Sequence, residues 1–201
     1  QGGMQGSTAV YAAEGAIVQL NSGTISAPGW NNTTIRANGI GSAVYNQGTN
    51  VTGVAGSSIG AQAINGGSYI FGSGTMSASN TGVQASGTGS SVLSSGNISA
   101  VQRAVHATNG GSVTVDAGSL ATTTAITGMA GIVADSGGQV ELIKPALLDS
   151  AAFAGNGIQV SSGGVVNLAG GMFYINGKNS SGLIIDGVGS AINSSATLSV
   201  Y

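Results

Sequence analysis

The segment Val105–Leu120 reads VHATNGGSVTVDAGSL and contains the pattern that decides the fold. Apolar and polar residues alternate on both sides of an Asn-Gly-Gly step, and another glycine precedes Leu120 by two positions. Alternation with a period of two is typical of a strand with one buried face. Glycine and asparagine between such runs favour tight turns, because both residues tolerate a positive φ. The segment therefore predicts three short strands separated by turns.

The pattern recurs eight times, at intervals of 22 to 27 residues. The first buried position of each unit, here called the anchor, falls at Val10, Ile35, Ala61, Val83, Val105, Ile132, Ile158 and Leu183. Offsets 0, +2, +8, +10 and +15 from the anchors are apolar in 37 of 40 cases, whereas the overall apolar content of 41% would give about 16. The exceptions are Asn50, Ser91 and Asn193. Such a repeat predicts a solenoid whose units bury their apolar faces against their neighbours.

Three short strands per unit predict an all-β fold, a right-handed parallel β-helix of about eight coils. Coils stacked ~4.8 Å apart would satisfy the backbone hydrogen bonds and make a rod about 40 Å long. The hand follows from the preference of parallel crossovers. Residues 1–201 are expected to form one continuous domain, a segment of a longer rod, and end-to-end dimerisation is the alternative for its open ends.

Two rows of the repeat have expected roles inside the rod. Offset +10 is expected to point into the core, at Leu20, Tyr45, Phe71, Leu93, Val115, Leu142 and Leu168. A substitution such as Leu93→Asp is therefore expected to break the stack locally. Offset +13 is expected to supply a glycine with positive φ between the second and third strands. These glycines are Gly23, Gly48, Gly74, Gly96, Gly118 and Gly171.

Composition narrows the classes of partner. The formal net charge is −2 with four Lys and Arg residues, so no nucleic-acid or anionic membrane surface is expected. The chain has no apolar run of 18 residues, so no membrane insertion is expected. It has no cysteine, which excludes disulfides and thiolate metal sites. No cofactor is expected.

The units follow the pattern Gly-[Val/Ile]-x-Ala-x-x-Gly-Gly-x-Val-x-Leu-x-x-Gly-x-Ile-x-Ala, seen in Ile132–Leu147, Ile158–Phe173 and Ala16–Ala27. Over essentially the whole chain this resembles the passenger region of a pertactin-like autotransporter of Gram-negative bacteria. The resemblance implies secretion to the bacterial cell surface, with a C-terminal translocator barrel outside this sequence. Passengers of this type include adhesins, self-associating proteins, proteases and toxins, so the resemblance does not fix the activity.

Few residues suggest catalysis. His106 is the only histidine and lies at the outward offset +1, after Gln62 and Gln84 on the preceding coils, with no carboxylate expected beside it. Asp135 and Asp186 share offset +3 two coils apart, near 10 Å, which would pair them only loosely. Solvated turn residues are the favoured interpretation, and a polysaccharide-active enzyme is the weaker alternative. The protein is therefore expected not to be an enzyme.

Surface binding is the preferred hypothesis. Offset +9 places Val44, Ile70 and Val92 in an outward apolar stripe, and the first inter-coil loop contains the only tryptophan, Trp30. Exposed apolar surface can mark a contact site, although β-branched residues also simply suit strands. For Trp30, folding over the edge of the core is an equal alternative. These four residues are the candidate binding surface of an adhesin. Its partner would be a host surface or matrix protein, a glycan, or a second rod; a passive stalk that presents another domain is the alternative.

Overall fold

The computed structural model describes residues 6–53, 56, 58–122, 129–144, 148–149, 156–170, 172–175 and 181–200. Over these ranges the chain forms strands and turns, without helix. All strand pairs are parallel, and each strand pairs with its equivalent in the next coil, except that β18 (Leu148–Asp149) and β21 (Met172–Ile175) are not paired with each other. The predicted parallel β-helix with three strands per coil is confirmed.

Sheets A and B each contain one strand from all eight coils. The strands of sheet A are β1 (Thr8–Ala13), β4 (Thr33–Asn38), β7 (Ile59–Ile64), β10 (Thr81–Ser86), β13 (Arg103–Thr108), β16 (Ala130–Ala134), β19 (Asn156–Ser161) and β22 (Leu183–Asp186). The strands of sheet B are β2 (Ile17–Leu20), β5 (Ala43–Asn46), β8 (Ser68–Phe71), β11 (Ser91–Ser94), β14 (Ser112–Val115), β17 (Gln139–Leu142), β20 (Val165–Leu168) and β23 (Ala191–Ser194).

Sheet C is formed by six of the third strands. They are β3 (Thr24–Ser26), β6 (Asn50–Gly53), β9 (Thr75–Ala78), β12 (Asn97–Ala100), β15 (Leu120–Thr122) and β18 (Leu148–Asp149). The last two third strands, β21 (Met172–Ile175) and β24 (Thr197–Val200), pair with each other in a two-stranded sheet.

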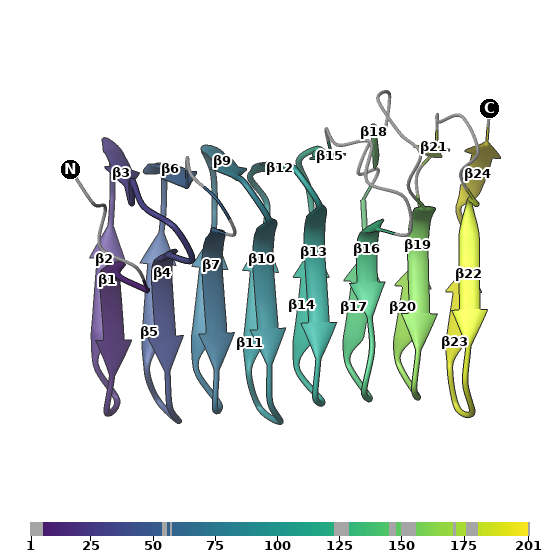
Figure 1. The fold of residues 1–201 in the computed structure, drawn as a ribbon, viewed down its shortest axis with the longest axis horizontal. Coiled ribbons are helices and arrows are strands. Elements are labelled where there is room, and N and C mark those ends of the chain that lie inside the picture. The colour runs from purple at the N-terminus through teal and green to yellow at the C-terminus, as the bar shows by residue number, and fades with distance from the viewer. Residues whose placement is uncertain are drawn as a thin grey trace.

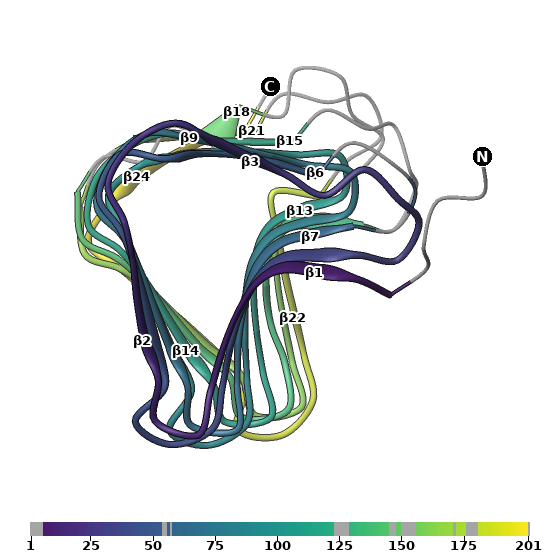
Figure 2. The same cartoon turned by 90° about the vertical axis from the view of Figure 1, so that its left-hand side faces the viewer.

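The coils lie side by side along the longest axis, with the two termini at opposite ends (Figure 1). Seen from the N-terminal end, each coil is three-sided, and the chain runs clockwise as it recedes from the viewer (Figure 2). The winding is therefore right-handed, as the preference of parallel crossovers predicts.

The anchors stack in register along the whole of sheet A. Each anchor lies opposite the next one, from Val10 and Ile35 to Ile158 and Leu183. Every anchor from Ile35 to Ile158 is completely buried. A large aliphatic side chain buried in this way stabilises the fold by ~1.5–3 kcal/mol. The predicted apolar row is thus confirmed as the centre of the core.

The turn between sheets A and B occurs in two lengths, which the repeat pattern did not separate. The short form has three residues, as in Asn65-Gly66-Gly67, with positive φ at its first two residues. The long form has four residues in a Gly-x-Gly-Ser sequence, with positive φ at both glycines. The long turns are 39–42, 87–90 and 187–190. Because side chains alternate along a strand, the extra residue reverses which side chains of β5, β11 and β23 face inward.

Because of this reversal, two residues expected to point outward point inward, and two residues expected to point inward point outward. Val44 and Val92 were expected outside, but both lie opposite the buried Tyr69 and are buried themselves. Tyr45 and Leu93 were expected inside, but both are exposed. All three exceptions to the repeat, Asn50, Ser91 and Asn193, fall in the coils with the long turn.

The shifted register places a polar side chain, Asn46, in the core. Its Oδ1 accepts a hydrogen bond from the Thr49 backbone N–H at 2.8 Å, and its Nδ2 donates to the Thr49 carbonyl at 2.9 Å. Nδ2 also lies 3.2 Å from the buried Tyr69 hydroxyl, whose pKa is raised by burial. The side chain thereby closes the next turn, and no oxygen or nitrogen of Asn46 is left without a partner.

The glycines at offset +13 have two different roles. The predicted positive φ is confirmed at Gly23, Gly74 and Gly118. It is wrong at Gly48 and Gly96, whose φ is not positive. A Cβ at Gly96 would overlap the ring of Phe71, so this glycine makes room for an aromatic side chain. Gly171 lies outside the described residues.

Candidate functional site

Sheet B presents an apolar stripe on its outer surface. Tyr45, Ile70 and Leu93 lie opposite one another on β5, β8 and β11, and together they are called the outer stripe. Tyr45 is 36% and Leu93 42% exposed, while Ile70 between them is half-buried. Three stacked outward side chains therefore form one continuous apolar surface across three coils.

Only Ile70 of the predicted stripe belongs to it. Val44 and Val92 are 0% and 2% exposed and belong to the core. Each is replaced in the stripe by the residue that follows it, Tyr45 or Leu93. The extra residue in the Gly-x-Gly-Ser turns is the sequence signal that could have placed Tyr45 and Leu93 in the stripe.

The surroundings of the outer stripe carry no charge. The five strands β2, β5, β8, β11 and β14 contain no Asp, Glu, Lys or Arg. Gln19 and Thr114 continue the same outward row on either side, and Glu141 is the first charged side chain in it. The N-terminal five coils thus present an uncharged face with an apolar centre.

Trp30 lies in the connection between β3 and β4, at the corner of sheets C and A, away from the outer stripe. Trp30 is 61% exposed. The ring rests on Gly56 of the next coil, where φ is +60° and a Cβ would overlap the indole. The Gly56 carbonyl accepts a hydrogen bond from the Ser79 hydroxyl. Trp30 is therefore exposed but held against its neighbouring coil.

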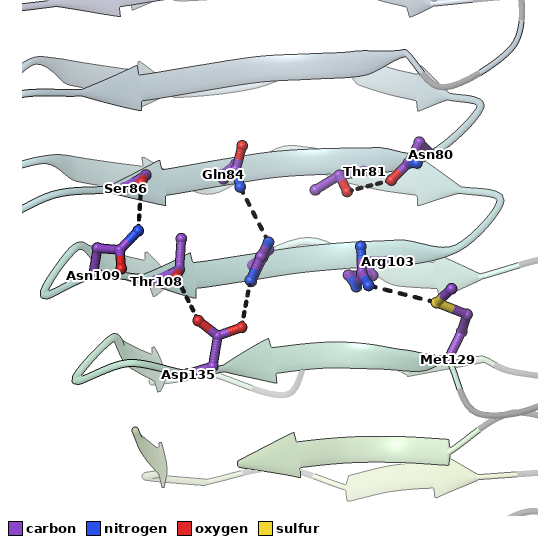
Figure 3. Close-up of polar contacts among 10 residues, drawn as sticks. Asn80, Thr81, Gln84, Ser86, Arg103, Thr108, Asn109, Met129 and Asp135 are labelled. Carbon is purple, nitrogen blue, oxygen red and sulfur yellow. Dashed lines mark hydrogen bonds and ion pairs between the residues drawn. The ribbon is translucent and has the colours of Figure 1, made fainter. Parts of the chain in front are cut away.

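Sheet A carries a polar row on its outer surface. Arg36, Gln62, Gln84 and His106 lie opposite one another on β4, β7, β10 and β13. Gln62 Nε2 donates to Gln84 Oε1 at 2.7 Å, and Gln84 Nε2 lies 3.1 Å from His106 Nδ1. His106 Nε2 lies 3.0 Å from Asp135 Oδ2. Gln84 and Asp135 approach β13 from its two sides (Figure 3). These four residues from Gln62 to Asp135 are called the polar relay.

These contacts fix the tautomer of His106. An amide N–H can only donate and an ionised carboxylate can only accept, so Nδ1 is the acceptor and Nε2 carries the proton. Burial lowers the pKa of His106, and the hydrogen bond from His106 to Asp135 opposes that effect only in part. Burial alone would raise the pKa of Asp135, but hydrogen bonds from Thr108, His106 and Ser136 outweigh it and lower that pKa. The pair is a neutral imidazole bound to a carboxylate.

The expectation that no carboxylate lies beside His106 was wrong. Asp135 is one coil further along and two residues beyond Val133, the direct neighbour of His106 in the sheet. Comparing residues at the same offset in successive coils does not reveal such diagonal neighbours, although long side chains can contact each other across this separation.

The relay directs its groups toward one another. Both nitrogens of His106 are hydrogen-bonded, and both oxygens of Asp135 accept, one from His106 and the other from the Thr108 hydroxyl. Asp135 thus faces β13, whereas Asp186 lies on the far side of β19. Of the two aspartates considered as a loose pair, Asp135 is therefore turned away from Asp186. Among the described residues, no three His, Asp or Glu side chains are grouped as metal ligands would be.

Over its first four strands, β3, β6, β9 and β12, sheet C has an uncharged polar outer face that the sequence pattern did not single out. One outward row consists of Thr24, Asn50, Thr75 and Asn97, and the next of Ser26, Thr52, Ser77 and Ser99. Asn50 Oδ1 accepts from both the backbone N–H and the hydroxyl of Thr75, at 3.0 Å each. Asn50 and Thr75 of the first row thus bind one another along the rod.

In comparisons with known proteins, no family model, no curated protein and no solved structure matches this chain. Within the described ranges, no helix has the length and apolar character needed to cross a membrane.

Proposed function

We propose that this chain is a non-catalytic segment of a bacterial surface rod, an autotransporter-type passenger, and that it acts as an adhesin through the face of sheet B. The outer stripe carries the proposal, because Tyr45 and Leu93 expose apolar surface beside Ile70. Apolar surface that is continuous across neighbouring strands is typical of contact sites. The partner is a host surface or matrix protein, a glycan, or a second rod, and the surface location rests on the sequence resemblance.

The size of this face predicts a weak contact. Five strands of four residues cover roughly 24 Å by 13 Å, or about 300 Å², at the usual strand spacing and rise. A stable interface buries about 800 Å² on each partner. One rod therefore binds weakly, and adhesion depends on many rods engaged at once.

A passive stalk is the second candidate. Sheets A and B are continuous through all eight coils, and such a ladder makes a stiff spacer. In this case no side chain of sheet B has to contact a partner.

The two candidates are separated by adhesion of cells or beads that display many copies of the rod. The variant carries Tyr45→Thr, Ile70→Thr and Leu93→Thr together, which removes the outer stripe but keeps strand-favouring residues. Asn167→Thr with Asn193→Thr, in the same outward row but beyond strands β2, β5, β8, β11 and β14, is the matched control. Loss of adhesion in the triple variant alone supports the adhesin.

Unchanged adhesion, with no binding of the purified rod to matrix proteins, glycans or itself, supports the stalk. Turnover of an acidic polysaccharide that is lost in Asp135→Asn would instead establish an enzyme.

A further inference from the structure

The polar relay has a direction. Gln62 donates to Gln84, Gln84 donates to His106, and His106 donates to Asp135. Every donor thus points toward Asp135, which is the anionic end of the relay. Each coil from the third to the sixth contributes one member, so the relay ties four coils together on the outside of sheet A. Hydrogen bonds aligned in this way polarise and strengthen one another.

The opposite end of the relay faces a cation. Arg36 lies beside Gln62 on the preceding coil. Gln62 Nε2 is engaged with Gln84, so its Oε1 is the group of this side chain that is left over. Gln62 Oε1 and Arg36 Nε are both buried without a hydrogen-bond partner. An amide oxygen without a donor and a guanidinium N–H without an acceptor thus belong to neighbouring residues of the row.

We propose that the polar relay is an acid-sensitive strap whose direction is set by the protonation of His106. A proton from solvent added at Nδ1 would place two donors, Nδ1–H and the Gln84 amide N–H, against each other. Gln84 then has to turn its carboxamide so that Oε1 accepts. Its Nε2 now faces Gln62, which has to turn in the same way and directs its own Nε2 toward Arg36. Acid therefore either reverses both amides or opens the strap.

The charged groups that face His106 are few. Asp135 approaches from the side of β16, Arg103 lies on the same strand, and β10 contributes the uncharged Gln84. The carboxylate favours the imidazolium, whereas burial and Arg103 disfavour it. The strap is consequently closed at neutral pH and responds below it.

The test is a side-chain NMR titration of the full chain labelled with ¹⁵N. At pH 7.5 the imidazole is expected as the Nε2–H tautomer. On acidification, the side-chain amide signals of Gln84 and Gln62 are expected to shift with the same midpoint as His106. Gln159, which lies beyond Val133 in the same row, is the internal control and is expected not to respond.

Two substitutions are expected to move that midpoint in opposite directions. Asp135→Asn lowers the midpoint because the carboxylate no longer stabilises the imidazolium, and Arg103→Gln raises it. His106→Gln keeps an acceptor toward Gln84 and a donor toward Asp135, and abolishes the response. An Nδ1–H tautomer at pH 7.5, or amide signals of Gln62 and Gln84 that ignore the titration of His106, would overturn the proposal.

Discussion

Substitution at two adjacent positions of β11 tests the shifted register. Val92 is 2% exposed and lies between Tyr69 and Val113 of the neighbouring coils. Val92→Thr keeps the shape but buries a hydroxyl among apolar groups, which costs ~1–3 kcal/mol. Leu93 is 42% exposed, so Leu93→Thr is expected to change the stability by about 0.5 kcal/mol or less. The unshifted offset pattern places Val92 outside and Leu93 inside. It therefore predicts a larger loss of stability for Leu93→Thr than for Val92→Thr.

Hydrogen exchange measures this difference locally, which suits a repeat protein whose coils can open separately. The amides of Ser91–Ser94 are expected to exchange roughly 5- to 150-fold faster in Val92→Thr, since each 1.4 kcal/mol is a factor of ten. In Leu93→Thr the rates are expected to stay near those of the original chain. Equal effects of the two substitutions, or a larger effect of Leu93→Thr, would refute the assigned register.

Three further outcomes are expected. The pKa of His106 is lowered in the folded chain, so the unfolded state takes up its proton first as the pH falls below about 6.5. The free energy of unfolding should therefore decrease from pH 7.5 to pH 5.5 in urea titrations, and His106→Gln should flatten this dependence; an equal slope in both proteins would contradict it. Gly111→Ala puts a Cβ within 2.5 Å of the Ala85 carbonyl oxygen and should cost ~1–3 kcal/mol in the same urea titrations, so unchanged stability would argue against the close coil contact. Gly56→Ala should displace the Trp30 ring and shift its fluorescence, and an unchanged spectrum would contradict the stacking.

The sequence was sufficient for the part of the fold that repeats strictly. Anchors such as Val83 and Val105 keep their phase because every coil has to place an apolar side chain over the previous one. The alternation of apolar residues predicted the three strands per coil, and the preference of parallel crossovers predicted the right-handed winding. These features depend on averages over eight units, so single irregular residues do not obscure them.

The candidate binding surface was less predictable because it depends on single insertions. One extra residue in the turn at 39–42 or 87–90 exchanges the two faces of the following strand, which replaces Val44 by Tyr45 and Val92 by Leu93. A constant offset cannot detect this exchange, although the polar Ser91 at an expected core position already indicated it. The contact of His106 with Asp135 was missed for a different reason, since it links different offsets on neighbouring coils.

The stacking of the coils is tested most directly by distances along one outward row. Gln19, Thr114 and Asn193 occupy the outward row of sheet B in the first, fifth and eighth coils. Because the chain has no native cysteine, spin labels attach only to cysteines introduced at these positions. Pulsed electron spin resonance should give about 19 Å from position 19 to 114 and about 34 Å from 19 to 193, at ~4.8 Å per coil. Label distances that do not increase in proportion to the number of intervening coils would contradict the parallel β-helix.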